Sequence, residues 1–335
     1  MPAPEVAILG AGLMGRWHAH AARRLGAHVI AVADPDADRA RALAGHGVPI
    51  FADPESLFQA VSPSVVHLCS PSASHSDIIR SAIAHNIHVF AEKPLASNAA
   101  ETRKLCDLAR KADVLLCPVH QYAFQPAIEQ IIKQRHRIGA LELVEIQYFS
   151  AGAVGAAVED LPHIAADILP HPIAIAQRLW PDVPFEALDW NVAPVGTAGW
   201  QVTVSVGQVM LRITISLAAR PTEASLVLYG DKGAWDTDLF HGYARFRDGI
   251  ASRRSKALRP FGDALSVLGH ASVNMAGRAL RRELAYPGLR DLTAAFYAAT
   301  GGHTEAPIGC EQTIAVAVLR DFFLSQTTQT EAGEK

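Results

Sequence analysis

The feature that most constrains the fold of this chain is a glycine-rich turn near its start, formed by Gly10, Ala11, Gly12, Leu13, Met14 and Gly15. The apolar run before it, residues 6–9, predicts a buried parallel strand, and residues 17–25, which lack proline and glycine, predict a helix. In that context Gly10 allows a tight turn, Gly12 lets the backbone approach a pyrophosphate, and Gly15 lets the helix pack on the strand. The unpaired amides at the helix start attract phosphate, so the stretch predicts a dinucleotide-binding turn.

An acidic residue follows the second predicted strand, residues 28–33, at the distance that such a turn requires. Asp34 lies 19 residues after Gly15, close to the spacing of about 20 expected for the acid that binds the ribose hydroxyls. A carboxylate accepts hydrogen bonds from the 2′- and 3′-hydroxyls and repels a 2′-phosphate, so Asp34 favours NAD(H) over NADP(H). The alternative role for Asp34 is an ordinary helix cap, because Pro35 and a helical run follow it.

The rest of the first 120 residues alternates predicted strands and helices, which is typical of a doubly wound parallel sheet. Ligands bind at the carboxyl ends of the strands in such sheets. Residues 65–69 form one of these strands, and the segment after it is polar. We therefore expect Ser70, Pro71 and His75 to border the cofactor.

Composition limits the classes of protein that the chain can belong to. Its 335 residues are enough for two domains, half of them are hydrophobic, and the formal net charge of −3 does not suggest a nucleic-acid binder. No apolar run approaches the roughly 18 residues that cross a membrane, and no signal peptide is visible. The four cysteines show no C-x-x-C spacing, which favours free thiols in a cytoplasmic protein.

The second half of the chain has a different pattern. Residues 143–149, 200–206, 209–217 and 223–229 alternate apolar and polar side chains, as half-exposed strands do. Gly207 separates two of these runs in the manner of a hairpin, and the runs together predict a mostly antiparallel sheet.

Five motifs together resemble the Gfo/Idh/MocA oxidoreductase family. They are the glycine turn G-A-G-x-M-G, S-P-x-x-x-H at 70–75, E-K-P-L-A at 92–96, F-x-P at 124–126 and D-x-x-x-H at 167–171. The resemblance implies a two-domain, nicotinamide-dependent enzyme that acts on a sugar, a sugar derivative or a cyclitol. It implies an N-terminal Rossmann domain over residues 1–121 and a C-terminal α+β domain over residues 122–335. The open sheet of the second domain would join subunits, as a homodimer or homotetramer.

The chain departs from the family pattern at two places. Gln121 and Ala123 stand where the family often has Asn and Arg, and Leu169 and Pro170 replace a glycine between the Asp and the His of D-x-x-x-H. These changes predict a differently shaped floor of the active site.

Three residues are the candidates for catalysis. Lys93 follows a predicted parallel strand, where an ammonium group stabilises negative charge on a reacting oxygen. His171 has an ordinary pKa near neutrality, which suits proton transfer, and Asp167 one turn earlier would orient it. The alternatives are a surface lysine and a helix-capping His–Asp pair. Proline is disfavoured inside a helix, so Pro170 predicts either a helix start or a kink.

Four further residues complete the candidate site. Glu92 is expected to support Lys93 or the ribose nearest the nicotinamide, and His163 is expected to line the substrate pocket. His120 and Gln121 are expected to touch the nicotinamide or the substrate, and a polar pair at the domain junction is the alternative. His163, Asp167 and His171 also have spacing that a metal site could use, but two nearby prolines make one regular helix improbable, so we expect no metal.

The stretch 245–290 has no place in the family pattern. Together with Asp291 it contains ten lysine or arginine residues and four acids. One interpretation is a solvated helical insertion, and another is a cap that binds an anionic group of the substrate, such as the diphosphate of a nucleotide sugar. A membrane-surface role is a third, weaker interpretation.

These features favour an NAD(H)-dependent oxidoreductase that interconverts a secondary alcohol and a ketone on a carbohydrate or cyclitol. Two other hypotheses fit the same motifs. The family includes redox-neutral glycosidases that oxidise and re-reduce their substrate with NAD, and the fold also suits a dinucleotide-sensing regulatory protein without turnover. We expect no nucleic-acid partner under any of these three hypotheses.

Overall fold

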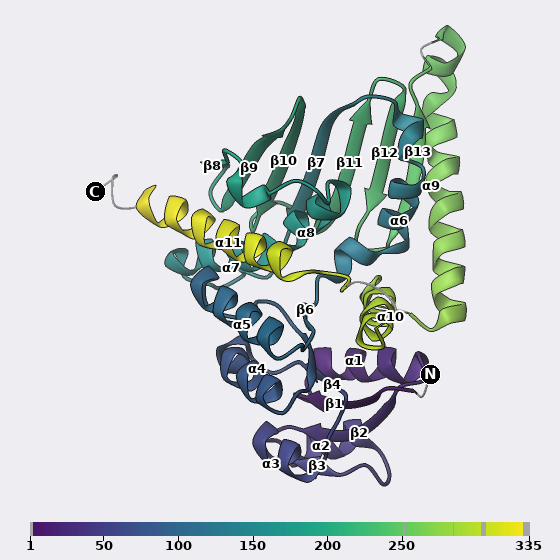
Figure 1. Ribbon diagram of the computed structural model, residues 1–335. Helices are drawn as coiled ribbons and strands as arrows, with labels where there is room; N and C mark the ends of the chain where they lie inside the picture. Colours follow the sequence, from purple (N-terminus) through teal and green to yellow (C-terminus); the bar gives the residue numbers. More distant parts are fainter. Residues whose placement is uncertain (1–2, 251, 284, 303–305, 331–335) are drawn as a thin grey trace. The chain divides into compact units, whose positions relative to one another are not determined.

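The computed structural model describes residues 3–250, 252–283, 285–302 and 306–330 (Figure 1). The chain divides into two compact units, which are Met1–His120 with Leu289–Asp321, and Gln121–Gly288 with Phe322–Lys335. This division differs from the expected domains 1–121 and 122–335, because residues 289–321 return to the first unit.

The first unit contains, among its described residues, a six-stranded sheet in the order β3-β2-β1-β4-β5-β6. Every neighbouring pair is parallel, so the doubly wound Rossmann sheet predicted from the sequence is confirmed. Its strands are β1 (Glu5–Leu9), β2 (His28–Ala33), β3 (Ile50–Phe51), β4 (Val65–Leu68), β5 (His88–Ala91) and β6 (Leu116–Pro118).

Helices cover both faces of this sheet because its strands are apolar on both sides. On β1, Ala7 and Leu9 pack into one buried cluster, and Ile8 between them packs into another. The helices of the unit are α1 (Leu13–Arg24), α2 (Ala37–Ala44), α3 (Pro54–Ala60), α4 (His75–Ala84), α5 (Ala99–Lys111), α10 (Leu289–Thr300) and the part of α11 (Cys310–Thr330) that ends at Asp321.

The second unit contains a seven-stranded sheet among its described residues, in the order β13-β12-β11-β7-β10-β9-β8. The β10–β7 pair is parallel and the other neighbours are antiparallel, so the predicted mostly antiparallel sheet is confirmed. The strands are β7 (Leu141–Phe149), β8 (Asn191–Pro194), β9 (Gly199–Val206), β10 (Val209–Ser216), β11 (Glu223–Gly230), β12 (Gly233–Asp238) and β13 (Tyr243–Asp248).

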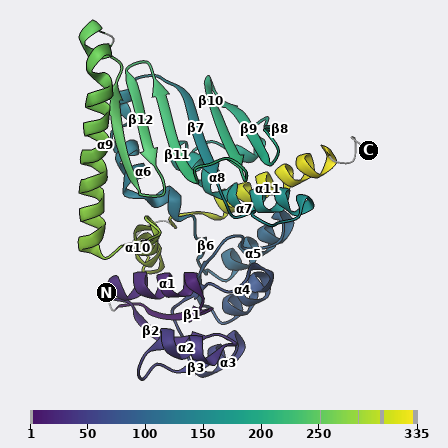
Figure 2. The ribbon, with the colours of Figure 1, turned by 180° about the vertical axis from the view of Figure 1, so that it is seen from behind.

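The helices of the second unit include one unusually long helix. In both views α9 (Arg253–Arg281) runs along the edge of the sheet that β13 forms (Figure 1, Figure 2). The shorter helices are α6 (Pro126–Lys133), α7 (Leu161–Ile168) and α8 (Pro170–Leu179). None of the described helices combines the length and the apolar character needed to cross a membrane. The four cysteines are free thiols.

Candidate functional site

Two glycines of the turn between β1 and α1 are required by close backbone contacts. Gly10 has φ +99°, and a Cβ there would lie 2.7 Å from the carbonyl carbon and oxygen of Cys69. A Cβ on Gly15 would overlap the carbonyl oxygen of Gly10. The strand order reverses between β1 and β4, and Cys69 follows β4, so the turn lies at the switch point where ligands bind in such sheets.

Gly12 has different surroundings from the other two glycines. It is the N-cap of α1, no side chain caps the amides of the first turn, and a Cβ added to Gly12 would meet nothing within 4 Å. The positive end of the helix dipole therefore faces open space where the backbone itself is accessible. These features fit the pyrophosphate of a dinucleotide.

Asp34 lies against the glycine turn. Its Oδ2 accepts a hydrogen bond of 2.6 Å from the Ala11 amide, and its Oδ1 accepts one of 2.8 Å from the Asp36 amide. Asp34 is not the cap of the helix that follows, because the N-cap of α2 is Asp36, which accepts from the amides of Asp38 and Arg39. The helix-cap alternative for Asp34 is therefore wrong, and its carboxylate is fixed beside the turn.

His75 ties two loops of the first unit together. Its Nδ1 lies 2.8 Å from the carbonyl oxygen of Pro94, and its Nε2 lies 2.9 Å from the carbonyl oxygen of Ser70. The side chain is 1% exposed. Because both ring nitrogens contact backbone carbonyls, His75 holds the loop after β4 beside the Lys93-Pro94 segment; the sequence placed it only along the cofactor.

Lys93 follows β5 and precedes Pro94 through a cis peptide bond. His120 follows β6, is 2% exposed, and its Nδ1 has no hydrogen-bond partner among the described residues. Burial, together with the positive charge of Lys93, lowers the pKa of His120 to about 3. The structure thus brings together the two residues expected at this edge of the sheet, and His120 is a neutral imidazole there.

Three of the predicted site residues, His163, Asp167 and His171, lie in the second unit. Pro170 occupies the first turn of α8, so the helical segment breaks at Leu169, one of the two outcomes that the sequence predicted. His163 and Asp167 lie four residues apart on α7, and both are exposed. His171 lies in the first turn of α8 and is half-buried. No group of three potential metal ligands occurs among the described residues.

Gln121, the first residue of the second unit, is 6% exposed, and its Oε1 has no hydrogen-bond partner in the described part of the chain. A buried amide oxygen without a partner is costly, so this atom is suited to accept a hydrogen bond from a ligand.

Two tyrosines beside His171 were not identified from the sequence. The ring of Tyr122 meets the His171 ring edge-on at 4.8 Å between centroids, and the ring of Tyr148 stacks on it at 6.2 Å. Burial raises the pKa of Tyr122 to about 12 and raises that of Tyr148, so both hydroxyls stay protonated at neutral pH. The available signal was the inward position of Tyr148 on β7, where its neighbours Val144 and Ile146 are apolar and buried.

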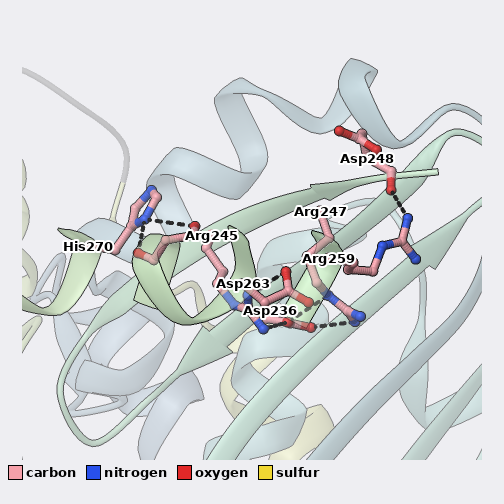
Figure 3. A network of polar contacts seen from close by, with 8 residues as sticks. Asp236, Arg245, Arg247, Asp248, Arg259, Asp263 and His270 are labelled. Atoms are coloured by element: carbon pink, nitrogen blue, oxygen red, sulfur yellow. Dashed lines mark hydrogen bonds and ion pairs between the residues drawn. The ribbon is translucent and has the colours of Figure 1, made fainter. Parts of the chain in front are cut away.

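Several arginines of the basic stretch form pairs within the second unit. Figure 3 shows Arg245 between Asp236 and Asp263, with ion pairs of 2.8 and 3.1 Å, and Arg247 on Asp236 at 2.7 Å. Arg259 donates to the Asp248 carbonyl at 3.2 Å. These partners favour the helical-insertion interpretation over an anion-binding cap. The side chains of residues 253–256 lie outside the described part.

Comparisons with known proteins agree with this architecture. A family model described as "Oxidoreductase family, NAD-binding Rossmann fold" matches residues 5–120. D-glucoside 3-dehydrogenase of Escherichia coli K12 is 33% identical over 134 residues, which are 39% of this chain and 38% of that protein. Inositol 2-dehydrogenase 4 of Saccharopolyspora erythraea is 34% identical over 142 residues, 41% of this chain and 42% of that protein. The matches thus span about two fifths of these relatives' length.

The fold of the whole chain also occurs among solved structures. The WlbA dehydrogenase from Bordetella pertussis, solved with NADH and UDP-GlcNAcA, has a TM-score of 0.73 over 98% of this chain and 96% of that one, at 16% identity. The family model, the curated relatives and the strand order agree that residues 5–120 form an NAD-binding Rossmann domain similar to that of the Gfo/Idh/MocA oxidoreductases.

Proposed function

We propose that this protein is an NAD(H)-dependent oxidoreductase that interconverts a secondary alcohol and a ketone on a sugar, a sugar derivative or a cyclitol. The observation that carries the proposal is the arrangement of the first unit, where Gly12, Asp34 and Lys93 all follow the carboxyl ends of parallel strands. The two curated relatives are named for glucoside and inositol substrates, which supports the substrate class.

The residues of the chain divide the chemistry between them. The nicotinamide supplies hydride transfer when the cofactor is bound. Lys93 would hold the reacting oxygen and stabilise the negative charge that develops on it. His171 would take or give the hydroxyl proton, with Asp167 as its orienting partner. Neutral His120 would supply a hydrogen bond without adding positive charge beside Lys93.

Asp34 is the basis for proposing NAD(H) rather than NADP(H). Its carboxylate is fixed beside the glycine turn by the amides of Ala11 and Asp36. A fixed negative charge at this place accepts hydrogen bonds from ribose hydroxyls and repels a 2′-phosphate.

We further propose a cytoplasmic homodimer or homotetramer. Free thiols favour a reducing compartment, and the sheet of the second unit has a half-exposed face that includes Glu145 and Gln147. Sedimentation of the purified chain tests the assembly, and a monomer at all concentrations would contradict it.

A panel of sugars and cyclitols tests the proposed reaction. Each compound is incubated with the protein and NAD⁺, and reduced cofactor is read by absorbance while products are separated by chromatography. Accumulation of NADH with a ketone product is the expected result. Release of a glycone without net NADH would show a glycosidase, and NADH binding without turnover of any compound would show a sensor; either outcome overturns the proposal.

A further inference from the structure

Four polar side chains form a continuous hydrogen-bonded row inside the first unit. Glu92 Oε1 lies 3.1 Å from His18 Nε2, and His18 Nδ1 lies 3.0 Å from His67 Nδ1. His67 Nε2 lies 2.7 Å from the hydroxyl of Tyr297. The four residues come from α1, β4, the end of β5 and α10, which are far apart in the sequence.

The middle of this row is sealed from solvent and its ends are not. His18 and His67 are both 0% exposed, whereas the Glu92 side chain is 14% exposed and Tyr297 is half-buried. The ring of Phe90 packs against both histidine rings, with centroids 5.5 and 5.2 Å away. Two fully buried histidines are uncommon in a core, because every ring nitrogen there needs a hydrogen-bond partner.

The contact between the two Nδ1 atoms restricts the protonation of the pair. One nitrogen must donate and the other must accept, so a single proton lies between His18 and His67. Burial, together with the nearby His18, lowers the pKa of His67 well below its ordinary value, so His67 stays neutral. When both rings are neutral, all three hydrogen bonds of the row point in the same direction.

Two such directions exist, and they differ by one proton on Glu92. In the first, Tyr297 donates to His67, His67 donates to His18, and His18 Nε2 donates to the Glu92 carboxylate. In the second, Glu92 is protonated and donates to His18 Nε2, His18 Nδ1 donates to His67, and His67 Nε2 donates to the Tyr297 oxygen. Passage from the first to the second moves one proton along every bond toward Glu92, and Tyr297 regains its own proton from water. The reverse passage moves one proton along every bond toward Tyr297, which returns one proton to water.

We propose that Tyr297, His67 and His18 are a proton relay that exchanges the proton of Glu92 with solvent at the Tyr297 end of the row. The proposal rests on the proposed oxidoreductase function, because oxidation of an alcohol releases one proton for each hydride transferred. Glu92 directly precedes Lys93, so the inner end of the relay adjoins the proposed catalytic lysine.

The other titratable groups around Glu92 do not interrupt the relay. The Cys69 thiol faces the same carboxylate, and burial, with the charge of Glu92, raises its pKa. Cys69 therefore keeps its proton at neutral pH. Lys93 is the next residue in the chain after Glu92. On α10, the residue before Tyr297 is Phe296, which stacks on Phe90 at 5.1 Å between centroids and is not ionisable.

Nitrogen NMR of the whole chain, labelled with ¹⁵N at histidine, tests the relay without a substrate. Signals are assigned with His18→Gln and His67→Gln, and spectra are recorded from about pH 4 to pH 8, which spans the ordinary range of carboxyl and imidazole titration. The expected result is that both histidines exchange their protonated nitrogen at one common midpoint while His67 stays neutral. Tautomers that stay constant, change at separate midpoints, or give a charged His67 would overturn the proposal.

A second experiment tests the relay by comparing the turnover rate in H₂O with that in D₂O. Tyr297→Phe and His67→Gln should lower turnover roughly tenfold, less than loss of a direct acid or base costs, and should enlarge the solvent isotope effect while NADH affinity is unchanged. Phe90→Leu is the matched control, because it disturbs the packing of the same rings and removes no proton carrier. An unchanged isotope effect in Tyr297→Phe contradicts the relay. If no compound is turned over, the proposed function fails, and the NMR result still decides the relay.

Discussion

Gly12 and Gly15 are three residues apart in one turn, yet a methyl group added to each would meet different surroundings. At Gly12 it would meet no protein atom within 4 Å, and at Gly15 it would overlap the Gly10 carbonyl. We expect Gly12→Ala to keep its melting temperature and lose NADH affinity, because the methyl group occupies the space left for a pyrophosphate. Gly15→Ala should lose about 1–3 kcal/mol of folding free energy through overpacking.

Denaturant unfolding and NADH titration on the same two variants measure this contrast. Equal effects of the two substitutions on NADH affinity, or a large loss of stability in Gly12→Ala, would show that Gly12 has only a structural role in the turn and does not make room for a pyrophosphate.

Lys93 and His171 are expected to act on the reaction rather than on cofactor affinity. Lys93→Met and His171→Ala should each leave NADH binding nearly intact and lower turnover about a hundred- to ten-thousand-fold. If both serve one proton-transfer unit, the double variant should be little worse than the poorer single variant. Turnover, NADH affinity and melting temperature are measured on the same samples, and near-normal turnover in either single variant removes that residue from the catalytic set.

At the scale of elements, the long helix α9 is joined to the sheet edge by charged pairs. Arg245 on β13 contacts Asp263 on α9 and Asp236 on β12, and Asp236 also holds Arg247. Asp236→Asn should destabilise the protein by about 2 kcal/mol, because two partly buried guanidinium groups lose their partner. Asp263→Asn, at a more exposed pair, should cost at most about 1 kcal/mol.

Urea unfolding of both variants, followed by circular dichroism, checks that order. A larger loss in Asp263→Asn would mean that α9, rather than the β12–β13 pair, depends most on this network.

Periodicity predicted most elements because local sequence determines them. The structure confirms three of these predictions, namely the strand that ends before Asp34, the hairpin around Gly207 and the helix break at Pro170. The extent of α9, 29 residues with Pro260 inside it, was not predicted, because its side chains are largely exposed and show only mild amphipathicity. Its role in the sheet edge depends on ion pairs with strands distant in sequence, which periodicity does not reveal.

At the scale of the whole molecule, buried histidines make folding stability depend on pH. Burial lowers the pKa of His120 to about 3 and lowers that of His67. The unfolded chain, with ordinary histidines, then binds protons that the folded chain does not. The folded state is therefore favoured most above about pH 6.5, and the free energy of unfolding falls as the pH falls below that value. At about pH 4.5 the loss due to His120 alone is roughly 3 kcal/mol.

Unfolding free energies of wild type and His120→Gln, measured by urea titration at several pH values, test this dependence. The variant should lose less stability than wild type between about pH 6.5 and pH 4.5. Parallel curves for the two proteins would show that His120 titrates normally in the folded state.

The geometry of the glycine turn was more predictable than the other parts of the candidate site. Gly10, Gly15 and Asp34 act within one turn and two adjacent strands, so spacing alone locates them. The return of residues 289–321 to the first unit, which supplies Tyr297 to His67, depends on contacts between distant segments. For the same reason, the contacts of Tyr122 and Tyr148 with His171 could not be predicted from the sequence.

The most direct test of the account is a paired titration of NADH and NADPH against wild type and Asp34→Ala. Wild type is expected to bind NADH more tightly than NADPH. Asp34→Ala should narrow this difference in affinity, because it removes both the hydroxyl acceptor and the charge that repels a 2′-phosphate. Wild-type protein that binds NADPH at least as tightly as NADH, or an Asp34→Ala variant with an unchanged preference, would contradict it.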